Sequence, residues 1–173
     1  MIQSRLVTQL AALMLACGCA AAQQSHAYVF AGAGGISVAG DTGKVLYGGA
    51  GAEAIVGSGM GLGAEGDVIR QVSAGWHGLL ALVSTNFYYH FVHTLDRIDP
   101  FVTIGYTSAF RGGHHEAGQD PGQANLVNFG GGVNYWFRPN TGLKLEFRDH
   151  LRPNRGPNAD YWSFRIGVTF ALR

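Results

Sequence analysis

Polar and apolar side chains alternate along this chain, and the alternation recurs in one segment after another. In the last segment, large apolar residues occupy every second position: Trp162, Phe164, Ile166, Val168 and Phe170. Between 143 and 148 the same alternation sets Leu143, Leu145 and Phe147 against Lys144, Glu146 and Arg148. Successive side chains of a β-strand point to opposite faces. Each such segment is therefore predicted to be a strand with one apolar face and one polar face.

Turn residues separate the segments, and almost none of the segments shows helical periodicity. Examples are the clusters at 40–43, 58–59 and 139–142. We predict strands at 27–38, 45–57, 60–72, 78–92, 99–110, 126–137, 142–152 and 160–172. The predicted fold is all-β, a single up-and-down antiparallel barrel of about eight strands.

Residues 1–22 have the composition of a cleaved secretory signal peptide. Arg5 precedes an apolar stretch from Leu6 to Ala16, and small residues at 20–22 provide a cleavage site. An alternative is a lipoprotein, tethered through a modified Cys17 or Cys19. The barrel domain is then 23–173, which contains neither cysteine and can form no disulfide.

Composition distinguishes a membrane barrel from a soluble one. The chain has 27 glycines, 47% hydrophobic residues and only 13% charged residues. A soluble sandwich or lipocalin-type barrel shows the same alternation with the faces reversed, and its small interior would have to hold Trp136, Trp162 and many other aromatic rings. In a membrane barrel the glycines and the charged residues both face the lumen. The lumen of an eight-stranded barrel is just wide enough to be filled by side chains. No apolar run after the signal peptide is long enough to span a membrane as a helix, so the chain is predicted to cross the membrane as strands.

Aromatic residues and connection lengths predict an orientation. Aromatics at 28–30, 87–91, 101 and 135–137 are expected at one membrane interface, and Trp76, Phe110, Tyr161 and Trp162 at the other. With both termini periplasmic, the two long polar stretches at 111–125 and 152–160 become extracellular loops, as outer-membrane barrels prefer.

Three consecutive stretches carry a family resemblance: 129–137 (FGGGVNYWF), the turn 138–142 and 143–149 (LKLEFRD). They resemble the small OmpA/OmpX-type outer-membrane barrels, over the whole of 23–173. The resemblance implies location in the outer membrane of a Gram-negative-type bacterium. Gly167, Phe170 and Leu172 are similar to the terminal signal read by the barrel-insertion machinery, although Leu172 replaces the usual aromatic and Arg173 follows it.

The polar faces predict a set of lumenal charges. Lys144, Glu146, Arg148 and Arg165 should point into the lumen, with acidic counterparts in the second and third strands at Glu53, Glu65 and Asp67. The resemblance implies that these charges form an internal salt-bridge network. We interpret them as a polar plug; a gate or narrow ion path is the alternative.

Two histidine motifs could carry chemistry. The stretch 147–154 is similar to PagL-type lipid A deacylases, in which a His-x-Ser pair acts with a Glu; here His150 is followed by Arg152 at the Ser position, so the nucleophile is missing. We therefore expect His150 and Asp149 at the lipid headgroup level. His114-His115-Glu116 could bind a transition metal, but a solvated loop is expected, and His90 shows no ligand spacing.

The sequence predicts an outer-membrane barrel with a structural or surface-interaction role and no enzymatic activity. The alternatives are a narrow porin-like permeability protein and a lipid A deacylase-like barrel. Expected partners are outer-membrane lipid, lipopolysaccharide and the barrel-insertion machinery, and the expected state is a monomer. With 12 basic and 11 acidic residues there is no basic patch for nucleic acid. No cofactor or metal is expected.

Overall fold

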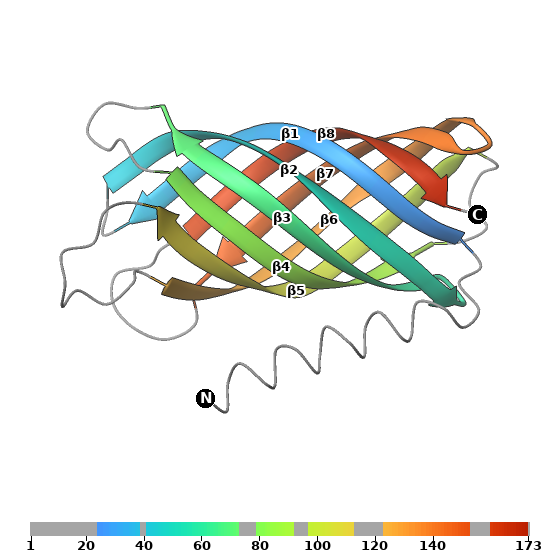
Figure 1. Ribbon diagram of the computed structural model, residues 1–173, viewed down its shortest axis with the longest axis horizontal. Helices are drawn as coiled ribbons and strands as arrows, with labels where there is room; N and C mark the ends of the chain where they lie inside the picture. Colours follow the sequence, from blue (N-terminus) through green and yellow to red (C-terminus); the bar gives the residue numbers. More distant parts are fainter. Residues whose placement is uncertain are drawn as a thin grey trace.

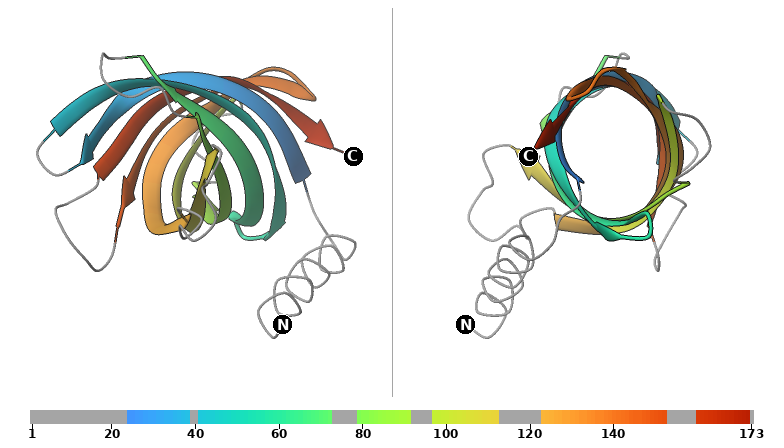
Figure 2. Two further views of the ribbon diagram at one scale, coloured as in Figure 1. Left: turned by 60° about the vertical axis from the view of Figure 1, so that its left-hand side comes forward. Right: turned by 90° about the vertical axis from the view of Figure 1, so that its right-hand side faces the viewer.

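The computed structural model describes residues 24–38, 41–72, 79–91, 97–112, 123–152 and 160–172. They form a closed antiparallel barrel in which each strand pairs with its sequence neighbours and β8 closes on β1 (Figure 1; Figure 2, right). The eight strands are β1 (Gln24–Val38), β2 (Asp41–Gly57), β3 (Met60–Gln71), β4 (Leu79–His90), β5 (Ile98–Gly112), β6 (Gln123–Arg138), β7 (Thr141–Leu151) and β8 (Asp160–Leu172). Within these ranges, no helix is long and apolar enough to cross a membrane. The predicted fold class is confirmed.

The two ends of the barrel differ in their connections. The first residue of β1 and the last residue of β8 lie at one end, here called the terminus end (Figure 1). The turns from β2 to β3 and from β6 to β7 are also there. Ser58 and Gly59 have φ values of 49° and 80°, and tight hairpins favour this left-handed pair because its twist matches that of the strands. The two longest connections, from β5 to β6 and from β7 to β8, leave from the opposite end, here called the loop end.

Three strands, β2, β5 and β6, are longer than predicted at the loop end. β2 starts at Asp41, and Thr42 and Gly43, expected in a turn, pair with Ser37 and Ile36. β5 and β6 extend past the predicted boundaries, so the first long loop is shorter than 111–125. Unpaired backbone groups are costly, so pairing continues wherever the neighbouring strand extends far enough to supply partners.

Apolar side chains face outward and glycines make room inside. Phe164, Ile104 and Val83 expose 63%, 56% and 55% of their surface on the outer wall. Inside, a Cβ on Gly32 would lie 2.5 Å from the Tyr47 ring, and a Cβ on Gly51 would lie 2.6 Å from the Tyr28 ring. The lumen is narrow enough that these bulky rings require glycine opposite them. Near the loop end the interior is an apolar layer that includes Val45, Ile69, Leu82 and Ala109.

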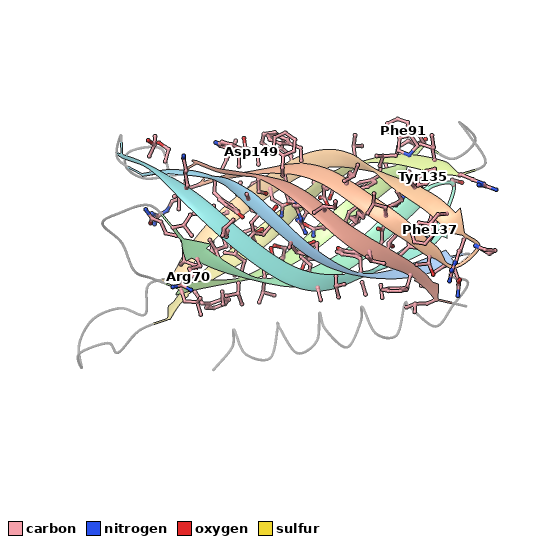
Figure 3. The ribbon with its side chains drawn as sticks, turned by 90° about the horizontal axis from the view of Figure 1, so that it is seen from above. Arg70, Phe91, Tyr135, Phe137 and Asp149 are labelled. Carbon is pink, nitrogen blue, oxygen red and sulfur yellow. The ribbon has the colours of Figure 1, made fainter. Side chains whose placement is uncertain are left out.

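Several aromatic residues predicted at the membrane interfaces lie inside the barrel instead. The buried ones are Tyr28, Phe30, Tyr88, Phe101 and Tyr161. The outward rings at the terminus end include Phe91, Tyr135 and Phe137 (Figure 3), whereas Phe110 and Trp162 face outward toward the loop end. The prediction was therefore wrong for these five residues, because strand parity and not proximity to a strand end decides the face. Trp76 lies outside the described residues.

Candidate functional site: the charged lumen

All seven predicted lumenal charges lie inside the barrel. Each exposes at most 5% of its surface: Glu53, Glu65, Asp67, Lys144, Glu146, Arg148 and Arg165. They project from β2, β3, β7 and β8. A lone charge in such a setting is very costly, whereas paired and hydrogen-bonded charges can be accommodated. Their contacts therefore determine whether they form one network.

Four of these residues form a compact group, the central cluster: Glu65, Glu146, Arg148 and Arg165. Glu65 accepts a hydrogen bond of 2.6 Å from Arg148 Nη1 at its Oε1. Arg165 donates to both oxygens of the same carboxylate, at 2.8 Å and 2.7 Å. Arg148 also donates to Glu146 Oε1 through Nε at 2.8 Å and through Nη2. Two carboxylates thus neutralise two guanidinium groups.

The central cluster spans the barrel from wall to wall. In the closed strand order, three strands separate β3 from β7 in either direction, so Glu65 and Arg148 come from opposite walls. Tyr28 on β1 donates to Glu65 Oε2 at 3.0 Å. Tyr88 on β4 accepts from Arg148 Nη2 at 3.2 Å and lies 2.9 Å from the Tyr28 hydroxyl. Together with Arg165 on β8, side chains from five strands (β1, β3, β4, β7 and β8) therefore meet in the middle of the lumen.

Lys144 lies next to the central cluster on its terminus side. Its Nζ is 3.9 Å from Glu146 Oε2. Three aromatic rings surround the ammonium group, with centroid distances of 3.8 Å to Phe101, 4.7 Å to Tyr28 and 5.2 Å to Tyr88. Cation–π attraction compensates part of the lost hydration of such a buried charge.

Glu53 belongs to a second group, nearer the terminus end. Its Oε1 is 2.6 Å from His90 Nε2. His90 Nδ1 lies 2.8 Å and 2.9 Å from the two oxygens of Asp99, and Asn134 donates to Asp99 Oδ2 at 2.9 Å. These four residues form the mouth cluster. Sequence reasoning missed His90, Asp99 and Asn134; strand parity could have found His90, which lies two residues after the inward-facing Tyr88 and is itself inward.

Asp67 is buried but joins neither group. Its Oδ1 has no hydrogen-bond partner among the described residues, and no ion pair to it is formed within them. Of the seven predicted charges, four thus form the central cluster, Lys144 lies beside it, Glu53 belongs to the mouth cluster, and Asp67 belongs to neither cluster.

His150 is not at the lipid headgroup level as predicted. It faces the interior and is 1% exposed, and its ring stacks on Tyr161 with centroids 5.0 Å apart. Neither ring nitrogen has a hydrogen-bond partner in the described part of the chain. Ser163, a nearby inward hydroxyl, donates to the Arg148 carbonyl at 3.3 Å. Asp149 lies on the outer wall, half-buried, toward the loop end (Figure 3).

The remaining predicted sites are placed as follows. In β8, Phe170 and Leu172 face outward with 43% and 50% of their surface exposed, and Gly167 faces inward, where a Cβ would lie 2.9 Å from Phe30 Cβ. The motif at 114–116 lies outside the described residues. Within the described ranges no group of three or more His, Cys, Asp or Glu side chains could hold a metal ion.

Known structures share this fold. The barrel is similar to Neisserial surface protein A (TM-score 0.72, 15% identity, 86% of this chain and 97% of that one). It is also similar to the N-terminal barrel domain of Pseudomonas aeruginosa OprF, with a TM-score of 0.60 and 18% identity over 87% of this chain and 100% of that one. A third similar structure is the outer-membrane enzyme PagL, with a TM-score of 0.51 and 17% identity over 83% of this chain and 99% of that one. No family model and no curated protein matches the chain. The likeness establishes the fold of a small outer-membrane barrel, as the sequence resemblance implied.

Proposed function

We propose that this protein is an integral outer-membrane barrel with a closed lumen, both termini in the periplasm and a structural or surface-interaction role. The outer wall supports membrane insertion. On β2 no outward side chain is charged from Leu46 to Val56. At about 3.3 Å per residue and a strand tilt of about 40°, this stretch is roughly 25 Å tall, the height of the apolar band of such barrels.

The bond between Arg148 and Glu65 carries the proposal of a closed lumen. It joins opposite walls at 2.6 Å, and the side chains of both residues are 0% exposed. Opening a path here would break this buried bond and leave Arg148 with Glu146 alone and Glu65 with Arg165 and Tyr28, and breaking a buried pair costs up to about 3–5 kcal/mol. The alternative, a narrow porin-like path, would require that cost at each opening.

Conductance in planar bilayers tests the closed lumen. We expect no stable conductance steps from the purified monomer. The double variant Glu65→Ala/Arg148→Ala removes the bridge and should produce steps. Thr103→Ala is the matched control, because it shortens a buried side chain whose hydroxyl has no partner and should leave the barrel closed. Stable steps from the wild-type protein would favour the porin-like alternative.

A surface-interaction role is supported by the arrangement of the connections. The two longest, 113–122 and 153–159, leave from the loop end, which faces the exterior if the termini are periplasmic. An epitope inserted in 113–122 should bind antibody on intact cells, and one inserted at 139–140 should not. Antibody binding to the epitope at 139–140 and not to the one in 113–122 would show that the protein has the opposite orientation. The proposed partners are outer-membrane lipid, lipopolysaccharide and, during assembly, the barrel-insertion machinery.

The geometry at His150 gives no support to acyl transfer. PagL shows that this fold can carry an enzyme, and a deacylase dyad needs a serine hydroxyl within hydrogen-bond reach of the histidine. His150 has no such partner in the described residues, and Arg152 is at the expected Ser position. We expect unchanged lipid A, by mass spectrometry, in cells that express this protein; loss of an acyl chain would refute the non-enzymatic proposal.

A further inference from the structure

The mouth cluster is part of a ring of side chains that surrounds the lumen at the terminus end. Glu53 on β2 meets His90 on β4 across β3, where Gly61 leaves room, since a Cβ on Gly61 would overlap Glu53 Oε1. His26 on β1 is opposite Glu53 and packs against Trp136 of β6, with ring centroids 4.9 Å apart. Together with the members of the mouth cluster on β5 and β6, these side chains encircle the lumen.

Water reaches one side of this ring and not the other. The side chain of Asp99 is 21% exposed, that of His90 is 2% exposed and that of Glu53 is 0% exposed. His90 therefore lies at the boundary between the wet mouth and the dry lumen. Next to it, the Phe101 ring has its centroid 5.6 Å from that of the His90 ring, and Lys144 Nζ lies 3.8 Å from the Phe101 centroid.

Both ring nitrogens of His90 face carboxylates. Nε2 is 2.6 Å from Glu53 Oε1, and Nδ1 is 2.8 Å from Asp99 Oδ1. An ionised carboxylate only accepts hydrogen bonds, and a neutral imidazole has a single N–H to donate. The protonated ring therefore satisfies both contacts, whereas the neutral ring would turn a lone pair toward one of the two carboxylates. Only the protonated form of His90 can close the ring from β2 to β5.

The other titratable or charged side chains around His90 are His26 on β1, Tyr88 on β4 and Lys144 on β7. The His26 and Tyr88 rings have their centroids 5.9 Å and 6.3 Å from that of His90. The inward residues of β3, β6 and β8 near the terminus end do not titrate; they are Gly61, Gly63, Asn134, Trp136, Thr169 and Ala171. Of the described side chains, only Glu53 and Asp99 therefore bond to the His90 ring.

We propose that the mouth cluster is a pH-dependent closure of the terminus end: protonated His90 joins Glu53 to Asp99, and loss of this proton opens the lumen as far as Lys144. This inference rests on the closed lumen proposed above and adds a second closure to it. The central cluster contains no histidine and stays in place when the mouth cluster opens. The open mouth therefore admits small solutes from the terminus end and does not let them cross the barrel.

Acylation of Lys144 in the purified full-length barrel, by a small water-soluble amine reagent, reports the opening. The chain has only two lysines, and Lys44 is exposed on the outer wall. The ratio of Lys144 to Lys44 acylation, from mass spectrometry, therefore corrects for the activity of the reagent at each pH. Where His90 is protonated, His90→Gln should raise this ratio about tenfold, the factor that one charge-assisted hydrogen bond contributes. As the pH is raised until His90 loses its proton, the two proteins should converge.

His150→Gln is the matched control, because His150 is another buried lumenal histidine, 1% exposed and outside the ring. It should follow the wild type at every pH. Equal ratios in the wild type and His90→Gln at all pH values would overturn the proposal. So would a pH response that survives in His90→Gln and disappears in His26→Gln, because it would assign the closure to His26.

Nitrogen NMR of the wild-type protein covers the case in which a variant does not fold. While Lys144 is protected, both ring nitrogens of His90 should carry protons, and the loss of one proton should accompany the rise in acylation. Protection of Lys144 beside a neutral His90 ring would overturn the proposal. Conductance tests the central closure separately: stable steps from the wild type, with Lys144 acylation still dependent on His90, would refute the closed lumen and leave the mouth closure intact.

Discussion

Replacement of Glu65 by glutamine tests the central cluster most directly. The Glu65 carboxylate accepts hydrogen bonds from Arg148 at 2.6 Å, from Arg165 at 2.8 Å and 2.7 Å and from Tyr28 at 3.0 Å. Its side chain is 0% exposed. Glu65→Gln keeps the shape but leaves two guanidinium groups with the single carboxylate of Glu146. Removing one partner of a buried ion pair costs about 3–5 kcal/mol, so we expect the free energy of unfolding to fall by about 4 kcal/mol.

Urea unfolding of the protein in lipid vesicles measures this loss, by linear extrapolation to zero urea. Thr103→Val is a control, because it replaces a buried hydroxyl that has no partner and should cost little. The double variant Glu65→Gln/Arg165→Met should recover part of the loss, since it restores the charge balance. A loss below about 1 kcal/mol for Glu65→Gln would refute the assignment of a paired, water-excluded cluster.

Three further predictions concern the two faces of the barrel. Leu145 is 42% exposed on the outer wall, so Leu145→Arg should lower stability in bilayers by roughly 2–4 kcal/mol; with single cysteines, position 145 should react with a lipid-soluble reagent and the lumenal position 146 should not. His150→Phe should leave stability unchanged or raise it, because both ring nitrogens lack partners and an unmatched buried polar group is costly; a large loss in urea unfolding would show that His150 has a partner. Phe170→Ala should slow assembly by purified insertion machinery in proteoliposomes, whereas Phe164→Ala, outward on the same strand, should not; equal rates would exclude Phe170 from the insertion signal.

Local sequence was sufficient to predict the strands and, in β7 and β8, their faces. Side-chain direction in a strand alternates with a fixed period of two, so Lys144, Glu146 and Arg148 had to share a face that Leu145 and Phe147 avoid. Composition then indicated which face was the lumen, since glycine-rich and charged positions coincided. The same reasoning failed in β1. There the outward residues include Ala31 and Ala33 and the inward ones Tyr28 and Phe30, so hydrophobicity does not distinguish the two sides.

Only the tertiary structure decided which charges meet. Glu65 reaches Arg148 and Arg165 because the barrel closes, so that side chains from β3, β7 and β8 meet in the lumen. Glu53 is bonded instead to His90 and so to Asp99, because inter-strand register sets it at the height of the terminus end. Register between strands depends on all eight pairings at once, whereas the period of two is a property of each strand alone. The sequence of a strand with clear alternation, such as β7 or β8, therefore specifies which side chains point inward, but not what they contact there.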